Sequence, residues 1–108
     1  MSIASTPSTV RDRFQRLTTQ WKEQARYLSN TAQIALLPAY QRIIGMGEPV
    51  VPLILEELQR DPDQWFWALE AITEENPVTT EIAGRTKLMA EAWIQWGKKQ
   101  GYVAKQVD

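Results

Sequence analysis

Carboxylates in the middle of the sequence are the side chains best suited to chemistry. Paired carboxylates can transfer protons as general acids and bases, and their oxygens can bind Mg²⁺. Nine acidic residues lie between positions 31 and 81: Glu48, Glu56, Glu57, Asp61, Asp63, Glu70, Glu74, Glu75 and Glu81. Asp61 and Asp63 stand where a helix N-terminus is expected, and negative charge is favourable there. Glu56 and Glu57 are adjacent and cannot share one helical face, so a solvated acidic surface is a better explanation than a catalytic or metal site.

The chain has no histidine and no cysteine. Histidine is the commonest general base and metal ligand, and cysteine supplies thiolate nucleophiles, disulfides and zinc ligands. The glycines at positions 45 and 47 do not form a phosphate-binding loop, because the characteristic spacing, the preceding strand and the following Lys-Ser/Thr pair are missing. The sequence therefore predicts no enzyme activity, no catalytic residue, no metal site and no cofactor.

The five tryptophans are the second group of interest. Four of them fall on apolar helical stripes and are expected in the core: Trp21, Trp65, Trp93 and Trp96. Trp67 lies nearly opposite Trp65 on the same predicted helix, so both cannot easily face one small core. Aromatic anchors are enriched at binding hot spots. Trp67 is covered either by another part of this fold, such as the first helix, or by a second molecule. For the second case we predict a partner-binding surface that consists of Trp67, Phe66, Glu70, Glu74 and Glu75.

Basic residues are concentrated at both ends of the chain. Residues 1–30 carry a net charge of +3, residues 31–81 carry −7 and residues 82–108 carry +3. The ends can neutralise the middle of the same molecule, which is our interpretation, or they can guide a charged partner. If the termini lie close together, a nucleic-acid surface could form from Arg11, Arg13, Arg16, Lys98 and Lys99. The overall charge of −1 argues against it.

A tryptophan-rich segment is expected to form the helix around which these groups are placed. Asp61 and Pro62 suit the cap and the first position of a helix. Trp65, Leu69 and Ile72 recur at i, i+4 and i+7, which is one helical face. Helices are predicted at residues 10–28, 38–44, 50–58, 62–73 and 85–100, with a short helical turn at residues 32–37. The last of these has an apolar stripe that consists of Leu88, Met89, Ala92, Trp93 and Trp96.

The segment from residue 38 to residue 73 resembles HEAT-type helical repeats. A helix at residues 38–44 is joined through GMG at residues 45–47 to a helix at residues 50–58, with GEPVVPLIL at residues 47–55 across the junction. HEAT-type repeats use such paired helices with a small-residue turn and a proline near the second helix. The resemblance implies a binding scaffold. It covers about one and a half units, fewer than the roughly three repeats that a solenoid needs.

Three stretches also resemble a small family of bacterial proteins that has no established activity: YQRIIGMG at residues 40–47, WFWAL at residues 65–69 and WIQWG at residues 93–97. We associate that family with mobile-element or toxin–antitoxin loci. The resemblance implies an alternative function as a small regulator or antitoxin-like protein. Such a protein would neutralise a toxin or basic enzyme with its acidic middle and contact DNA through its basic ends. Neither resemblance carries over a catalytic residue.

The sequence predicts one all-α domain, a compact bundle of four to five helices with a HEAT-like hairpin. Its 108 residues, 44% hydrophobic and 23% charged, are typical of a globular protein with a single core. We expect a flexible arm at residues 1–9, a helical domain at residues 10–101 and a polar tail at residues 102–108. No secretory signal or apolar run near the roughly 20 residues of a membrane span is present, so a cytoplasmic location is expected. The preferred function is a non-catalytic protein–protein interaction module or accessory subunit, with a protein partner or self-association rather than nucleic acid, membrane or cofactor.

Overall fold

The computed structural model describes residues 9–103 of the 108-residue chain. This part folds into helices joined by loops, which confirms the all-α prediction. The elements are α1 (Val10–Ala25), α2 (Thr31–Ala35), α3 (Pro38–Met46), the 3-10 helix η1 (Glu48–Val50), α4 (Val51–Arg60), α5 (Phe66–Thr73) and α6 (Thr86–Gln100). Most of the predicted N-terminal arm and C-terminal tail lies outside the described residues. Within residues 9–103, none of the helices has the length and apolar character needed to cross a membrane.

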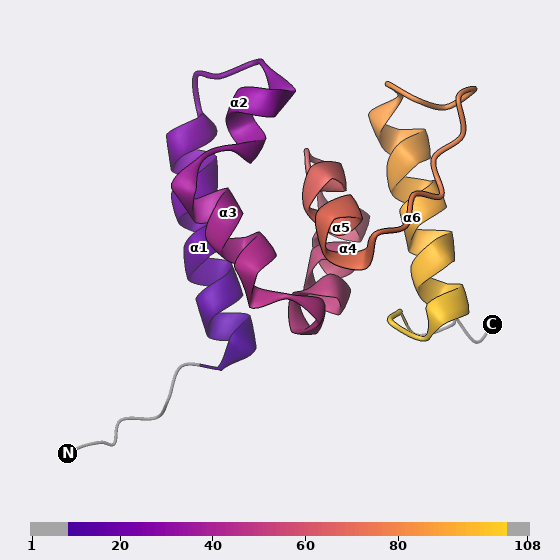
Figure 1. The fold of residues 1–108 in the computed structure, drawn as a ribbon, viewed down its shortest axis with the longest axis horizontal. Coiled ribbons are helices and arrows are strands. Elements are labelled where there is room, and N and C mark those ends of the chain that lie inside the picture. Colours follow the sequence, from indigo (N-terminus) through magenta and orange to yellow (C-terminus); the bar gives the residue numbers. More distant parts are fainter. Residues whose placement is uncertain (1–8, 104–108) are drawn as a thin grey trace.

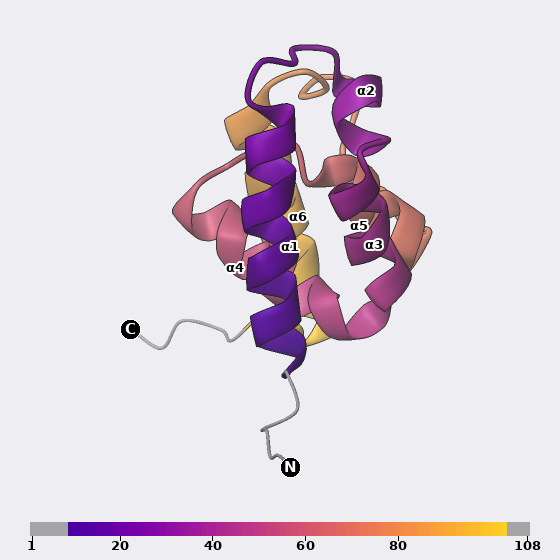
Figure 2. The same ribbon diagram turned by 90° about the vertical axis from the view of Figure 1, so that its left-hand side faces the viewer.

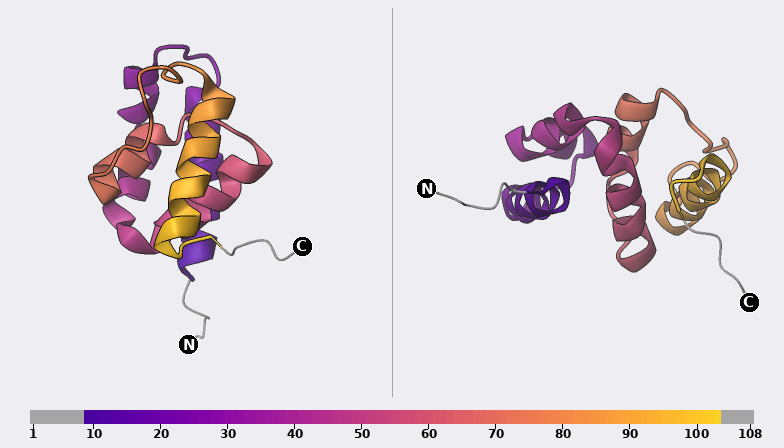
Figure 3. Two further views of the ribbon diagram at one scale, coloured as in Figure 1. Left: turned by 90° about the vertical axis from the view of Figure 1, so that its right-hand side faces the viewer. Right: turned by 90° about the horizontal axis from the view of Figure 1, so that it is seen from below.

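The helices form three layers along the longest axis of the molecule (Figure 1). α1, α2 and α3 form one outer layer, α4 and α5 lie in the middle, and α6 forms the other outer layer. Figure 2 shows α1 and α3 on the first outer face, and Figure 3 shows α6 across the opposite face. α3 packs along α1 and reaches α5, while α4 packs against α6. The middle layer therefore separates the two terminal helices.

The HEAT-like hairpin is not confirmed. In such a hairpin α3 and α4 would pack mainly against each other, but α3 packs mainly on α1 and α5, whereas α4 packs mainly on α6. The junction explains the difference. Gly47 ends α3 with φ 78° and ψ −155°, a conformation that favours glycine, and η1 then turns the chain before α4 begins. α3 therefore ends at Met46, two residues beyond the predicted end at residue 44, with Gly45 inside the helix and Gly47 directly after it.

Four aromatic side chains form the centre of the core. The Trp65 ring lies 5.5 Å from Phe14, 4.6 Å from Trp21 and 6.2 Å from Tyr40, measured between ring centroids. All four residues are almost completely buried, as predicted for Trp21 and Trp65. Aromatic side chains bury large areas and favour tilted or offset pairs over face-to-face sandwiches. Because these residues come from α1, α3 and the position before α5, the cluster joins the first outer layer to the middle one.

The predicted start of the tryptophan-rich helix is wrong, because α5 begins at Phe66 rather than at residue 62. Residues 61–65 form an irregular connector between α4 and α5. Asp61 follows the end of α4 and does not cap α5. The Asp63 carboxylate accepts a hydrogen bond from the backbone amide of Gln64 at 2.7 Å. This local contact favours a turn over a continuing helix.

A hydroxyl group from α3 takes the place of the missing helix cap. Tyr40 Oη accepts a hydrogen bond from the backbone amide of Ala68 at 2.8 Å and donates one to the carbonyl of Gln64 at 2.9 Å. Ala68 is the third residue of α5, and the first amides of a helix have no intrahelical acceptor. Burial raises the pKa of the Tyr40 hydroxyl, because a phenolate would be poorly solvated there. The neutral hydroxyl thus fixes the start of α5.

The buried side of α6 differs from the predicted stripe. Ala90, Trp93 and Gly97 are buried, whereas Leu88 is 36% exposed. Burial of Trp93 was predicted, and placement of Leu88 in the packed stripe is wrong. A Cβ atom on Gly97 would lie 2.5 Å from Leu55 Cδ1, so this helix approaches α4 too closely for a larger side chain. The buried side of α6 therefore consists of Trp93 with the small residues Ala90 and Gly97, and Gly97 permits the close approach to α4.

Candidate functional site

One side of α5 is exposed along its length. Trp67, Glu70, Ala71 and Glu74 are spaced by one, three and four residues, which places them on one helical face. All four residues are exposed, and Trp67 is 46% exposed. We call these four residues the outer face of α5. It contains three of the five residues predicted to bind a partner.

The opposite side of α5 holds the helix in the fold. Trp65, Ala68 and Leu69 are completely buried, and α5 packs against α3 and α4. Each residue rotates the helix by about 100°, so Trp67 points roughly 200° away from Trp65. Phe66 is partly buried and packs at the border of the core. The packing that buries Trp65 therefore leaves Trp67 facing outwards.

Negative charge without internal compensation is concentrated at the C-terminal end of α5. Among residues 9–103, Glu70, Glu74 and Glu75 take part in no ion pair. The helix dipole is negative at this end, so carboxylates here are less favourable than they would be at the N-terminus. Helix stability does not account for three carboxylates at this position.

Glu75 lies beyond a sharp turn. Glu74 adopts the left-handed conformation with φ 59°, which is uncommon for a residue other than glycine. Thr73 Oγ1 donates a hydrogen bond to the Leu69 carbonyl at 2.7 Å and accepts one from the Glu75 amide at 3.1 Å. The turn places Glu75 at the wall of a cavity of about 210 Å³ that also borders Trp96. Glu75 is therefore next to the outer face of α5 but belongs to a separate feature.

The five basic residues predicted as an alternative nucleic-acid surface do not form one patch. Arg11, Arg13 and Arg16 lie on α1, whereas Lys98 and Lys99 lie in the last turn of α6. Figures 1 and 3 show these two helices in opposite outer layers, with α4 between them. The condition under which the two basic groups would act together is therefore not met in the described part of the chain.

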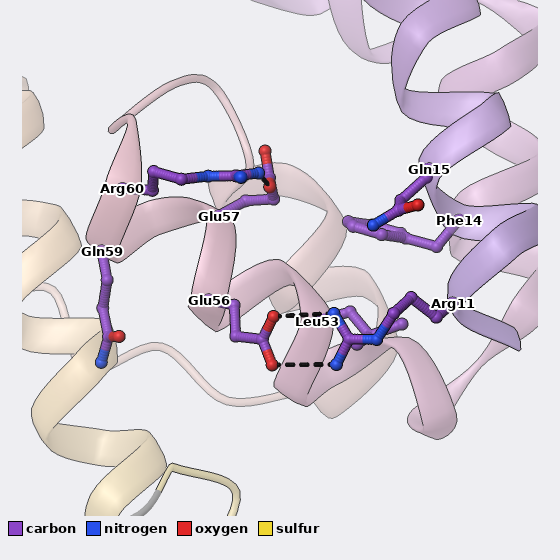
Figure 4. A pocket seen from close by; sticks show the side chains of 8 residues that line it. All are labelled: Arg11, Phe14, Gln15, Leu53, Glu56, Glu57, Gln59 and Arg60. Carbon is purple, nitrogen blue, oxygen red and sulfur yellow. Dashed lines mark hydrogen bonds and ion pairs between the residues drawn. The ribbon is translucent and has the colours of Figure 1, made fainter.

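A groove of about 320 Å³ lies between α1 and α4 (Figure 4). Arg11 donates to both carboxylate oxygens of Glu56, at 2.9 and 3.1 Å, and Arg60 pairs with Glu57. The hydrogen bonds from the Arg11 guanidinium lower the pKa of Glu56. The i,i+4 spacing along α4 predicts a pair between Glu56 and Arg60, and this prediction is wrong because Glu56 turns to α1 instead. The charges of the groove therefore compensate one another.

Ion pairs between α1 and the connector before α5 support charge neutralisation within the molecule. Lys22 Nζ lies 3.2 Å from Asp61 Oδ2 and 3.8 Å from Asp63 Oδ2. The two aspartates thus hold the connector to α1, a role that differs from the predicted helix N-terminus. No group of three or more acidic side chains in the described residues is arranged to hold a metal ion.

Sequence reasoning missed two tyrosines. The role of Tyr40 depends on Ala68, which is 28 positions away in the sequence, and no local pattern indicates it. Tyr102 stacks on Trp96 at 5.6 Å and donates a hydrogen bond to Glu48 at 2.9 Å. A local signal existed for Tyr102, since a glycine at a helix C-terminus followed by an apolar residue is typical of a chain that folds back on its helix.

Comparisons of the chain with known protein families, with curated proteins and with solved structures found no match. The resemblances to HEAT-type repeats and to the small bacterial family stay predictions. Function must therefore be inferred from the side chains of the described residues. Among the features they form are the outer face of α5 with its unpaired carboxylates, the groove with compensated charges between α1 and α4, and the small cavity beside α6.

Proposed function

We propose that this protein is a non-catalytic protein–protein interaction module or accessory subunit that binds its partner through the outer face of α5. The observation that carries the proposal is the exposure of Trp67, at 46%, next to the unpaired carboxylates Glu70 and Glu74. Tryptophan is among the residues most enriched at binding hot spots. Its aromatic area supplies affinity, and the neighbouring charges select a partner.

The exposed part of Trp67 is large enough to matter for binding. A tryptophan side chain can bury roughly 200 Å², so covering the exposed half removes about 100 Å² of surface from water. At about 25 cal/mol per Å² this contributes about 2–3 kcal/mol, which is the size of a hot-spot residue. One such anchor does not make an interface. A partner must also contact the carboxylates beside it.

The charge of the outer face favours a different protein over a second copy of this chain. In a symmetric dimer the same patch meets itself. Glu70 and Glu74 would then approach their own counterparts, and like charges across an interface are unfavourable. A partner with a basic rim around an apolar contact avoids this repulsion. Self-association through α5 is therefore the less favourable form of the same function.

The proposal is tested with Trp67→Ala, using Trp65→Ala as the matched control. Trp67→Ala should cost about 1–2 kcal/mol of unfolding free energy, because the buried half of the side chain is lost while alanine is the better helix former; this lowers the melting temperature by about 4–16 °C. Trp65→Ala should cost about 3–5 kcal/mol, because Trp65 fills the core. Light scattering should give the mass of one chain. A monomer in which both substitutions lower the melting temperature equally would show that Trp67 is structural and would overturn the proposal.

The regulator or antitoxin-like function remains the alternative. It would use the same acidic surface to neutralise a basic enzyme, so Trp67, Glu70 and Glu74 have the same role in it. Its additional DNA contact lacks support from the arrangement of α1 and α6. The HEAT-like interpretation adds a scaffold role in principle, and the packing of α3 and α4 offers it no support.

A further inference from the structure

A small cavity lies where the end of α5, the end of α6 and the start of η1 meet. Its volume is about 210 Å³, and its walls include two carboxylates and two aromatic rings: Glu48, Glu75, Trp96 and Tyr102. We propose that this cavity binds the side-chain cation of a lysine or arginine from a partner protein. The inference rests on the proposed function, since residues at the C-terminal end of α5 line this cavity.

The end of α6 builds one wall of the cavity. Gly101 has φ 86° and its amide bonds to the Lys98 carbonyl at 3.3 Å, while the Tyr102 amide bonds to the Gly97 carbonyl at 2.8 Å. These two bonds form a Schellman motif, which reverses the chain at a helix C-terminus. The reversal lays the Tyr102 ring on Trp96, with 5.6 Å between centroids and 19° between planes.

Two carboxylates from distant parts of the chain complete the cavity. Glu48 comes from the first position of η1, and Glu75 comes from the turn after α5. Tyr102 Oη donates to Glu48 Oε2 at 2.9 Å, which orients this carboxylate and leaves its second oxygen available. Within residues 9–103 neither glutamate takes part in an ion pair. The cavity therefore has negative charge and lacks a cation.

Aromatic rings and carboxylates together are the chemistry that recognises an organic cation. An ammonium or guanidinium group is attracted to the face of a tryptophan or tyrosine ring, and it donates hydrogen bonds to carboxylate oxygens. The volume is below the roughly 300–1,000 Å³ of pockets that hold drug-sized ligands. A single basic side chain fits this size better than a larger molecule does.

The position of the cavity indicates how the partner would lie. Trp67 lies in the first turn of α5, and Glu75 follows the left-handed turn that ends this helix. We therefore expect a partner segment that runs along α5, with an apolar residue over Trp67 and a lysine or arginine in the cavity.

The test is an NMR titration of the full chain with amino-acid amides. The probes are Nα-acetyl-lysine amide and Nα-acetyl-arginine amide, and Nα-acetyl-norleucine amide is the uncharged control. The Trp96 indole N–H and the Tyr102 backbone amide should shift saturably with the cationic probes, with a Kd in about the 1–100 mM range expected of one exposed cation site. Absent shifts, shifts that do not saturate, or equal shifts with the norleucine probe overturn the proposal.

Charge-neutral variants locate the binding. Glu75→Gln and Glu48→Gln should each weaken binding of the arginine probe by about threefold, as expected for one exposed charge pair. Glu91→Gln is the matched control, since Glu91 is exposed on α6 and is not part of the cavity wall. Equal weakening by Glu91→Gln would show general charge attraction and overturn the site.

The cavity and the outer face of α5 can be tested separately. The probes are free amino-acid amides, so their binding does not require a partner protein. Trp67→Ala leaves the cavity intact and should bind the arginine probe as the wild type does. If the wild type binds the probes and Trp67→Ala captures the partner as well as the wild type does, the cavity proposal is supported and the proposed function is contradicted. If Trp67→Ala loses partner capture and the wild type binds no probe, the proposed function is supported and the cavity proposal is contradicted.

Discussion

Tyr40 shows how a single hydroxyl group can decide where a helix begins. Its oxygen accepts a hydrogen bond from the amide of Ala68, and its hydroxyl donates one to the carbonyl of Gln64. The hydroxyl therefore satisfies backbone groups on both sides of the start of α5. Most helices obtain this contact from the residue just before the helix. Here that residue is Trp65, whose side chain packs in the core and makes no capping hydrogen bond. The cap therefore comes from another helix.

Tyr40→Phe should lower the free energy of unfolding by about 1–3 kcal/mol. The substitution keeps the ring in the aromatic cluster but leaves a buried amide without its acceptor. Urea unfolding followed by circular dichroism measures the loss. Tyr27→Phe is the control, because Tyr27 is 90% exposed and should change stability little. Equal stability of the two variants would contradict the capping role.

The raised pKa of Tyr40 also predicts a loss of stability in alkali. A tyrosine exposed to water has a pKa of 10.0, and burial raises the pKa of Tyr40 in the folded protein. Above pH 10.0 the unfolded chain therefore loses this proton first, so stability is fully present below that pH and falls as the pH rises. The wild type should lose up to about 1.4 kcal/mol per pH unit more than Tyr40→Phe. Parallel pH profiles of the two proteins would contradict the prediction.

At the scale of elements, two glycines within helices distinguish the effect of intrinsic helix propensity from the effect of side-chain packing. Gly45 in α3 and Gly97 in α6 both lie inside helices, where alanine is intrinsically better by about 1 kcal/mol. A Cβ on Gly45 meets nothing within 4 Å, whereas one on Gly97 lies 2.5 Å from Leu55 Cδ1 and 3.0 Å from Val103 Cγ2. The same substitution should therefore have opposite effects.

Gly45→Ala should raise the free energy of unfolding by about 0.5–1 kcal/mol. Gly97→Ala should lower it by about 1 kcal/mol, because overpacking against buried Leu55 exceeds the gain in helix preference. Thermal unfolding of the two variants measures both changes. Stabilisation by Gly97→Ala would show that α4 and α6 can separate without cost, and the close approach would then not determine the buried side of α6.

Helices of this chain were predictable where local chemistry sets their ends. Asn30 caps α2 with its side chain, and glycines follow α3 and α6, which are local patterns typical of helix ends. The start of α5 was not predictable, because Tyr40 and Lys22 hold the connector before it through tertiary contacts. The buried side of α6 was missed for a similar reason. Hydrophobicity favoured Leu88, but the close contact with α4 requires small residues.

At the scale of the whole molecule, the uneven charge of the chain has two outcomes. On one side, α1 neutralises part of the acidic middle through Arg11 with Glu56 and through Lys22 with the connector aspartates. On the other side, the carboxylates at the end of α5 find no cation among the described residues. Glu48 and Glu81 are also outside the ion pairs of residues 9–103, and Glu70 and Glu74 lie on the outer face of α5 with the exposed tryptophan.

The outer face of α5 could be predicted from helical spacing, because Trp65 and Trp67 cannot both point into one core. The cavity beside α6 could not. Its walls come from three separate segments, and their meeting depends on the turn at Glu74 and the reversal at Gly101. A site within one helix can be found from the periodicity of its residues. A site formed where the ends of several helices meet can be found only from the tertiary structure.

Comparative capture of partner proteins tests the central claim, that Trp67 is there to bind, most directly. Immobilised wild-type protein and Trp67→Ala, each shown to be folded, are exposed to the same lysate of the native host, and bound proteins are quantified by mass spectrometry. We predict a stoichiometric protein on the wild type that falls by at least about tenfold on the variant, since the loss of about 2–3 kcal/mol exceeds the 1.4 kcal/mol of a tenfold change. Capture of the same proteins in the same amounts by both would contradict the claim.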